Sequence, residues 1–498
     1  MGARVKKIVL ILLAAALLVC AAQVQHSLNR DRDLLGLTHA PPLENAPPVL
    51  AFTTVALGGF RGLISNALWM RAMELQDQDK FFEMVQLADW ITKLEPRFPH
   101  VWVVQAWNMA YNISVKFKDF EDRWRWVQRG TELLRDHGLR YNPNDVLIHR
   151  ELAWFFQHKM GDNLDDAHMH YKREWARLMA EALGTNKVDL SELVDPKTDD
   201  AKRRAALLRE KFKMDPEFMK QLDERYGPLE WRLPEASAIY WAAVGLEKAK
   251  LNPGRVNKDD LVMLRRVIYQ SMQMSFRRGK LIFNPFAGTV ELGPNLDIIP
   301  KVNAAYEEQA AEDEKNRDVI KRAHRNFLRD AVYFLYAHAR LKEAEQWFNY
   351  LATNYPNDNL ITGNTNSKPG QITLDEYALA RLQEDIGETS RDRVKAILEG
   401  LAYNYFRELV LGEYERAEGF RLFARKVYQR YARETADSGE RIRIPPPEEI
   451  EKEVLKQLLD PEHGWIPEAR QRLRTELGLP AELERSRTNQ AQGALPPS

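Results

Sequence analysis

The chain has 498 residues, of which 44% are hydrophobic, and its 72 basic side chains balance its 72 acidic ones. This length allows roughly three average domains, although a stacked array of repeats needs no such division. The zero formal net charge gives no support for nucleic acid as the main partner, because such a surface favours clustered basic residues. Since Cys20 is the single cysteine, an intramolecular disulfide and a cysteine-based zinc site are excluded.

The N-terminus has the pattern of an export signal. Residues 1–7 include three basic side chains, and residues 8–24 follow without a charge. Three interpretations are open. The first is an uncleaved anchor that extends to residue 27, which supplies the roughly 20 residues that a bilayer needs. The second is a cleaved signal peptide, and the third is a lipoprotein signal, because 17–20 resembles a lipobox with Val19 in place of Gly, Ala or Ser.

All three interpretations predict export, and we favour the anchor. Residues 8–24 would then form a single-pass helix in the cell membrane. The basic residues before this helix place the N-terminus in the cytoplasm. The bulk of the chain is therefore expected to be extracytoplasmic, on the periplasmic side in a Gram-negative cell.

The segment 25–58 is polar and contains two Pro-Pro pairs, which is typical of a linker. Helix-turn-helix pairs are then predicted over 59–182. The first pair covers 60–75 and 81–94, where apolar residues recur at helical spacing. Pro96 closes this pair because proline cannot continue a helix.

The middle of the chain, 183–300, is predicted to be an irregular helical insert. Residues 183–215 contain a charged run and indicate a solvated excursion with one helix. Residues 235–250 and 259–278 form another predicted helix pair. The segment 280–299 alternates apolar and polar residues, which indicates extended structure, either a β-hairpin or a loop.

The clearest repeat lies at 325–358. Two short amphipathic helices stand back to back there, separated by a polar break at 339–343. The small Ala344, the aromatic Phe348 four residues later and Pro356 eight after that resemble the tetratricopeptide (TPR) pattern. The helix-turn-helix unit of that family recurs about every 34 residues.

The TPR resemblance covers about half of residues 60–433. The tracts 226–242 and 86–98 are similar to those of uncharacterised bacterial membrane-anchored TPR proteins. The resemblance implies an all-α fold, which would be an irregular TPR-like helix-turn-helix solenoid. Together with the N-terminal pattern, it predicts this solenoid with one N-terminal transmembrane helix.

The C-terminal part is predicted to continue in the same way. TPR-like units are expected over 301–435, short C-terminal helices over 436–484 and a disordered tail over 485–498. The helices expected after the clearest repeat span 374–385, 391–411 and 413–433.

The densest polar cluster lies at 157–171. Its His158, Asp165 and His168 are candidate metal ligands, because histidine and carboxylate together can hold zinc or iron. A metal there would indicate an alternative function, a metal-dependent enzyme with a helical body and a His/Asp site around 158–170.

A second interpretation assigns this cluster to helix ends. Gly161 would end one helix, Asp162 or Asn163 would cap the next, and Asp165 and Asp166 would favour its positive end. We favour this interpretation and predict no cofactor. The motifs HExxH, Walker A and GxSxG do not occur in the sequence, so no familiar enzyme signature and no small-molecule substrate is indicated.

A partner-binding groove is the remaining candidate site. In TPR arrays the first helix of each unit lines the concave face, where ligands bind. Carried over to 325–358, the resemblance gives Asn326, Arg329, Tyr333 and Tyr336, whose side chains suit peptide backbone and carboxylates. The alternative is that Tyr333 and Tyr336 pack against the neighbouring unit. The expected function is a membrane-anchored extracytoplasmic TPR scaffold that mediates protein–protein interaction in the bacterial cell envelope, with partners that remain unknown.

Overall fold

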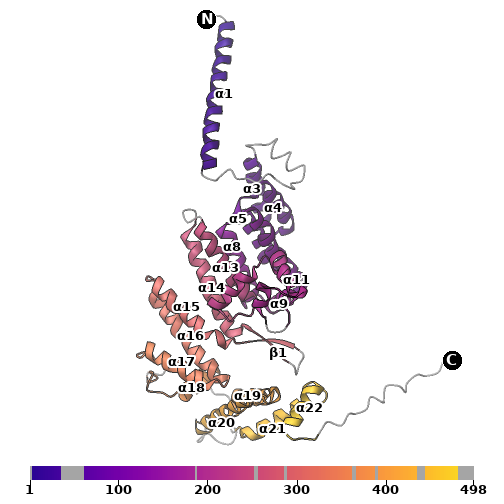
Figure 1. Cartoon of the computed structure of the whole chain (residues 1–498), viewed down its shortest axis with the longest axis vertical. Helices are drawn as coiled ribbons and strands as arrows, with labels where there is room; N and C mark the ends of the chain where they lie inside the picture. Colours follow the sequence, from indigo (N-terminus) through magenta and orange to yellow (C-terminus); the bar gives the residue numbers. More distant parts are fainter. Residues whose placement is uncertain are drawn as a thin grey trace, which may run out of the picture. The chain divides into compact units, whose positions relative to one another are not determined.

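The described residues form mostly α-helices (Figure 1), which confirms the all-α class. They divide into two compact units, Met1–Ile113 and Ser114–Ser498, and the division falls inside the predicted range 59–182. Most of the predicted linker, 25–58, and the whole of the predicted tail, 485–498, lie outside the described residues. The chain is described by a computed structural model that covers residues 3–34, 61–185, 188–251, 256–284, 289–361, 366–386, 391–434 and 444–480.

The first unit contains a helix pair where the sequence predicts one. Helices α3 and α4 pack against each other through Ala72, Leu75 and Met84. Among the residues that the structure describes, no helix combines the length and apolarity needed to span a membrane. The helices of this unit are α1 (Ala3–Leu34), α3 (Arg61–Asp77), α4 (Phe81–Leu94) and α5 (Pro99–Trp107), and α5 continues as the π-helical segment η2 (Asn108–Ile113).

The second unit begins with helices that end in π-helical turns. Asp119 caps α6 by accepting the N–H of Glu121, and Asp145 caps α8 by accepting the N–H of Ile148. π-helical turns are rare and often lie at functional sites. The elements are η3 (Ser114–Lys116), α6 (Phe120–Glu132), η4 (Leu133–Gly138), α7 (Leu139–Tyr141), α8 (Val146–Trp154) and η5 (Phe155–Gly161).

The prediction of a solvated excursion with one helix at 183–215 is wrong. Ala201, Ala205, Leu208 and Phe212 are all buried, and their spacing forms an apolar stripe within the charged run. The charged side chains around them face solvent, so the stripe was concealed by its surroundings. The helices here are α9 (His168–Leu183), α10 (Leu190–Val194), α11 (Asp199–Leu207), η6 (Leu208–Phe212) and α12 (Pro216–Tyr226).

Helix α13 (Pro234–Leu251) is central to this unit, and it packs against α8 and α14 (Lys258–Arg278). The predicted helices 235–250 and 259–278 are thereby confirmed. Gly245 permits this close packing, because a Cβ at that position would lie 3.1 Å from the Cβ of His149 and 3.1 Å from Leu264.

Of the two alternatives predicted for 280–299, the structure confirms the β-hairpin. Strands β1 (Lys280–Asn284) and β2 (Thr289–Gly293) pair in antiparallel register, with Leu281 opposite Leu292. The turn that joins the strands lies outside the described residues. The short segment η8 (Leu296–Ile298) then leads into the next helices.

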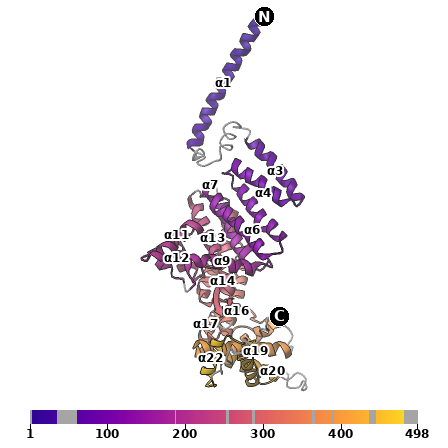
Figure 2. The ribbon, with the colours of Figure 1, turned by 90° about the vertical axis from the view of Figure 1, so that its right-hand side faces the viewer.

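The remaining helices follow the predicted order, and the structure confirms the helix pair at 325–358. Ala344, Phe348 and Leu351 bury one face of α17. Figure 2 shows α19, α20 and α22 grouped together, in agreement with their contacts. The helices are α15 (Ile299–Glu312), α16 (Arg317–Ala337), α17 (Leu341–Asn354), α18 (Leu374–Ile386), α19 (Arg391–Leu411), α20 (Tyr414–Glu434), α21 (Pro447–Leu458) and α22 (Pro467–Glu476).

Candidate functional site

The predicted groove on α16 is only partly available to a partner. Tyr336 is 3% exposed, and its hydroxyl donates to Asp375 of α18. The Nζ of Lys426, from α20, lies 2.7 Å from the same carboxylate. Tyr336 therefore joins three helices inside the protein, and its assignment to a binding surface is corrected to the alternative of packing.

The other three residues of the predicted groove are more accessible. Asn326 is exposed, whereas Arg329 and Tyr333 are half-buried. The ring of Tyr333 lies 6.0 Å from the ring of Phe334, edge to face. A binding role for Asn326, Arg329 and Tyr333 stays a prediction.

The polar cluster at 157–171 lies at the junction of α6, η5 and α9. Helix α9 begins at His168 after Ala167, so Asp162 and Asn163 do not cap it as predicted. Asp165 instead precedes the helix, where its Oδ1 accepts the N–H of Ala167 at 2.9 Å. Asp165 and His168 are therefore not stacked along one helix.

Asp165 is the centre of a buried ion-pair network. Its carboxylate lies 2.5 Å from Nζ of Lys159 and 3.4 Å from Arg123, and Tyr171 donates to it at 3.3 Å. Burial alone would raise the pKa of Asp165, but Lys159, the Ala167 N–H and Arg123 outweigh burial and lower the pKa. Two cations thus occupy the carboxylate that the sequence suggested for a metal.

The two predicted histidine ligands point to different neighbours. His158 stacks on Trp154, with ring centroids 4.6 Å apart, whereas Nδ1 of His168 lies 3.1 Å from Nζ of Lys172. Within the described ranges, no group of three or more His, Cys, Asp or Glu side chains is arranged to hold a metal ion. The structure does not bring His158, Asp165 and His168 together.

A second group of buried charges lies behind this network. Lys172 and Glu235 are only 2% and 1% exposed, and Nε of Arg278 lies 3.6 Å from Oε1 of Glu235. Burial lowers the pKa of Lys172 to about 8 and raises the pKa of Glu235, because both charged forms lose solvation. Such opposed shifts are common at functional sites.

Gly161 makes room for this group. A Cβ at this position would lie 2.9 Å from the carbonyl oxygen of Phe156, 3.1 Å from Met274 and 3.7 Å from the carboxyl carbon of Glu235. Any larger residue would therefore push η5 away from α13 and α14. Glycine ends η5, as the sequence predicts, and also allows Glu235 to approach.

A cavity of about 660 Å³ lies beside the two charged groups, between η5, the loop after it and α14. Amide side chains form much of its wall: Gln157, Asn163, Gln270 and Gln273. Nε2 of Gln157 donates to Oε1 of Gln270 at 3.0 Å. The Oε1 of Gln157 and the Nε1 of Trp154 are buried and have no hydrogen-bond partner among the described residues.

These unpaired atoms have a chemical consequence. A buried acceptor or donor without a partner costs about 1–3 kcal/mol. Both residues line the cavity, while these two atoms are themselves covered by protein. The cavity volume and the amide side chains gathered in its wall make this the candidate site of the second unit.

Sequence reasoning located one side of this site and missed the other. The residues on α13 and α14 come from far along the chain, and Arg278 and Asn163 are 115 residues apart. One signal was available, because Glu235 is an acidic residue at the start of an otherwise apolar run, 234–245. Nothing in the periodicity of α14 distinguishes Arg278 from an exposed arginine.

Changing Glu235→Gln is expected to alter how stability depends on pH. Because the folded state raises the pKa of Glu235 above 4.5, it binds more protons than the unfolded state there, and stability falls as pH rises from 4.5 to the folded-state pKa. The variant lacks this loss, which amounts to about 1.4 kcal/mol per pKa unit. Urea unfolding measured from pH 5 to 8 should show the free energy of unfolding of the variant rising relative to that of the natural chain.

The control for this measurement is Glu314→Gln, since the side chain of Glu314 is 85% exposed. Its difference from the natural chain should stay constant over the same pH range. A constant difference for Glu235→Gln as well would contradict the assigned role of burial.

No protein-family model, curated protein or solved structure matches the chain.

Proposed function

We propose that the chain is a non-catalytic helical binding protein that holds a segment of a partner protein in the cavity between η5 and α14. The observation that carries the proposal is the group of four amide side chains in the wall of that cavity, Gln157, Asn163, Gln270 and Gln273. A peptide group offers one N–H donor and one C=O acceptor, and an amide side chain can pair with both.

The remaining chemistry of the wall supports a polypeptide ligand. Amide side chains donate and accept at once, and Gln270 and Gln273 lie on the same helix, α14. A volume of about 660 Å³ is within the usual range of 300–1,000 Å³ for ligand pockets. Several residues of an extended segment would fit.

The setting of the protein is proposed from the sequence. Residues 8–24 are uncharged and follow three basic residues, which supports a single-pass anchor in the cell membrane. The body would then be an extracytoplasmic scaffold of the bacterial cell envelope. The helix pairs α3–α4 and α16–α17 support a TPR-like solenoid as its architecture. Asn326, Arg329 and Tyr333 would offer a second contact surface.

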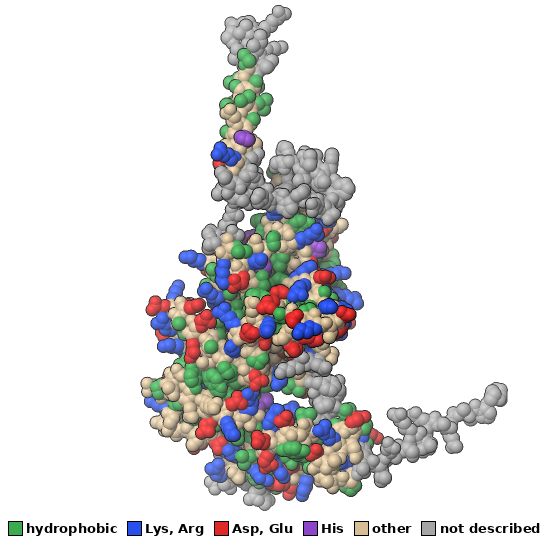
Figure 3. All heavy atoms as spheres, in the orientation of Figure 1, with side chains coloured by type: hydrophobic (Ala, Val, Ile, Leu, Met, Phe, Trp, Pro, Cys, Tyr) green, Lys and Arg blue, Asp and Glu red, His purple; other side chains and the backbone are tan. Residues whose placement is uncertain are grey.

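The distribution of charge on the surface favours such a role over the binding of a polyion of one sign. Figure 3 shows basic and acidic side chains interspersed over the visible face of the described residues. Interspersed charge keeps a protein soluble without a strong field of one sign. Recognition is therefore assigned to the cavity.

Site-specific photocrosslinking tests this proposal. The photoreactive amino acid p-benzoyl-phenylalanine, placed at Gln270 in the full chain in its native membranes, should give a discrete adduct with another protein. Gln270 is exposed and lines the cavity. The same amino acid at Arg266, which is exposed one turn earlier on α14 and does not line the cavity, is the matched control and should give no such adduct.

A further inference from the structure

Arg278 lies in the cavity wall and is held by neutral oxygens. Its guanidinium donates to the carbonyl of Gly161 and to Oδ1 of Asn163. The carboxylates near it are more distant, with Glu235 Oε1 at 3.6 Å and Asp162 Oδ1 at 3.9 Å. Its Nε has no hydrogen-bond partner among the described residues. The positive charge of Arg278 is therefore only weakly neutralised.

Glu235 is poorly suited to neutralise this charge. Neither of its carboxyl oxygens has a hydrogen bond within the described part of the chain, and an ionised carboxylate without hydrogen bonds is costly to bury. Burial correspondingly raises the pKa of Glu235, although Lys172 and Arg278 act in the opposite direction. Burial thus disfavours the charged form of Glu235, the carboxylate that lies 3.6 Å from Arg278.

The other charged and titratable groups around Glu235 are a lysine, a histidine and an aspartate. Lys172 of α9 is buried and keeps a pKa of about 8, so it is mostly charged at neutral pH. Burial, Lys172 and Arg278 lower the pKa of His168, which is therefore neutral there. Asp162, on the loop before α9, is a carboxylate that acts on Lys172 and lies 3.9 Å from Arg278.

A second arginine lines the same cavity. The side chain of Arg277 lines the cavity and is 63% exposed, and its Nη2 lies 2.9 Å from Asp330. An exposed ion pair of this kind contributes about 0.2–1 kcal/mol, so Arg277 can exchange its partner at little cost. Two arginine side chains thus line one cavity.

We infer that the segment bound in this cavity carries a carboxylate, which binds between Arg277 and Arg278. This inference rests on the proposed function and names the chemistry of its ligand. Guanidinium groups bind carboxylates through paired, charge-assisted hydrogen bonds. The carboxylate comes either from the C-terminus of a partner chain or from an acidic side chain of the partner.

Three capped dipeptides separate these sources. N-acetyl-glycyl-glycine has a free C-terminal carboxylate, N-acetyl-glycyl-glutamic acid amide has a side-chain carboxylate, and N-acetyl-glycyl-glutamine amide is neutral. Each probe is titrated into the full chain in detergent at pH 7. Binding is followed by the NMR signal of the Trp154 indole N–H, and the Trp154→Phe variant identifies that signal. At least one carboxylate probe is expected to bind about tenfold or more tightly than the neutral probe.

Two variants locate the binding. Arg277→Gln should weaken binding of the carboxylate probe several-fold and leave binding of the neutral probe unchanged. The matched variant Arg266→Gln should change the binding of neither probe. Arg277 is chosen because its side chain is 63% exposed, whereas that of Arg278 is 20% exposed. Its replacement should therefore disturb the fold less. Glu235→Gln should leave the affinity within about twofold, because burial disfavours the charged form of this carboxyl.

The outcomes separate this inference from the proposed function. Equal affinity for all three probes, or tighter binding of the neutral one, overturns the carboxylate assignment even if residue 270 crosslinks to a partner. Tight binding of a carboxylate probe without any crosslink overturns the protein-segment proposal and leaves a site for a small carboxylate. A large gain in affinity for Glu235→Gln would show that Glu235 already neutralises Arg278, which also contradicts the inference.

Discussion

Replacing Asp165→Ala is expected to lower the free energy of unfolding by about 3–5 kcal/mol, the usual cost of removing one partner from a buried ion pair. Lys159 and Arg123 are 4% and 8% exposed, and both lie within 4 Å of this carboxylate. Without it, Lys159 loses its contact at 2.5 Å, and Tyr171 loses this acceptor. Urea unfolding of the full chain at pH 7 measures the change.

Asp166→Ala is the matched control. Its side chain is 71% exposed, although it lies 2.5 Å from the same Arg123. Because solvent already covers most of the Asp166 side chain, its removal should cost about 1 kcal/mol, less than the removal of Asp165. An equal loss for both variants would contradict the central position of Asp165.

The contribution of Asp165 also has a defined pH range. Because the folded state lowers its pKa below 3.8, the stabilisation is fully present above pH 3.8. It is lost as pH falls through the folded-state value, where the carboxylate takes up a proton. The difference between Asp165→Ala and the natural chain should therefore shrink in strong acid.

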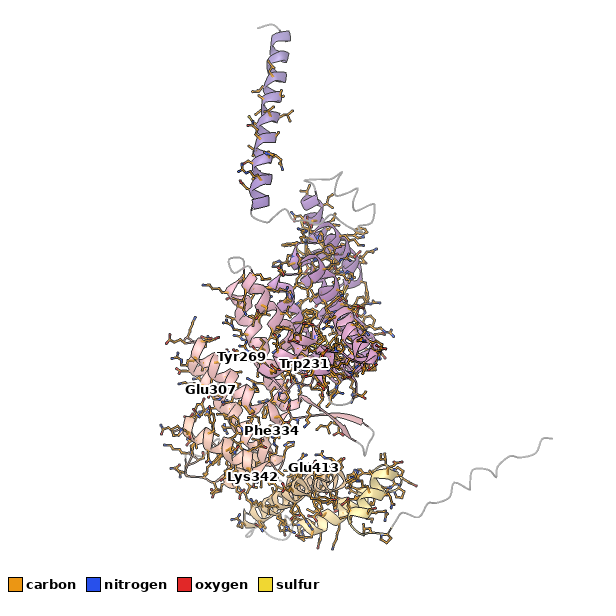
Figure 4. All side chains as sticks on the ribbon, in the orientation of Figure 1. Trp231, Tyr269, Glu307, Phe334, Lys342 and Glu413 are labelled. Atoms are coloured by element: carbon orange, nitrogen blue, oxygen red, sulfur yellow. The ribbon has the colours of Figure 1, made fainter. Side chains whose placement is uncertain are left out.

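The second large effect is expected for Trp231→Ala. This side chain is 1% exposed and is labelled in Figure 4 among the helices of the second unit. Its Nε1 donates to Oδ1 of Asp223 at 3.0 Å, and the same oxygen accepts the N–H of Leu229 at 2.9 Å. Truncation leaves a large void, which lowers the free energy of unfolding by about 3–5 kcal/mol for a buried tryptophan. The loss is measured as a shift of the urea midpoint.

Trp231→Phe separates the volume of the ring from its hydrogen bond. Phenylalanine keeps most of the apolar contact and loses the bond to Asp223, a group whose pKa burial raises. The loss should be about 1–3 kcal/mol, the cost of an unsatisfied buried group. If the alanine and phenylalanine variants lose the same amount, the ring does not fill the core as described.

Much of the helix arrangement was predictable because apolar periodicity and helix breakers coincide. Helix α4 has the predicted limits 81–94, and α19 has the predicted limits 391–411. In α4 the buried stripe runs the length of the helix, and in α19 it runs from Val394 to Val410. The region 183–215 was misinterpreted because small alanines on its buried stripe carry a weak hydrophobic signal beside many charges.

The site was predictable only in its local half. The cluster 157–171 stood out as polar, but the role of Asp165 depends on Lys159 and Arg123, and the partners of Tyr336 come from two later helices. Helical spacing pairs residues three or four apart, and it carries no information about contacts between distant helices. For the same reason the charges on α13 and α14 were not connected with the cluster.

The binding proposal is tested most directly by mapping the crosslink at residue 270 in native membranes. The account predicts one discrete adduct with a peptide of another protein at residue 270 and none at residue 266, because only the first lines the cavity. Mass spectrometry of the digested adduct identifies the bound segment and whether it carries a carboxylate. Absence of an adduct at residue 270, or the same adducts at both positions, would contradict the account.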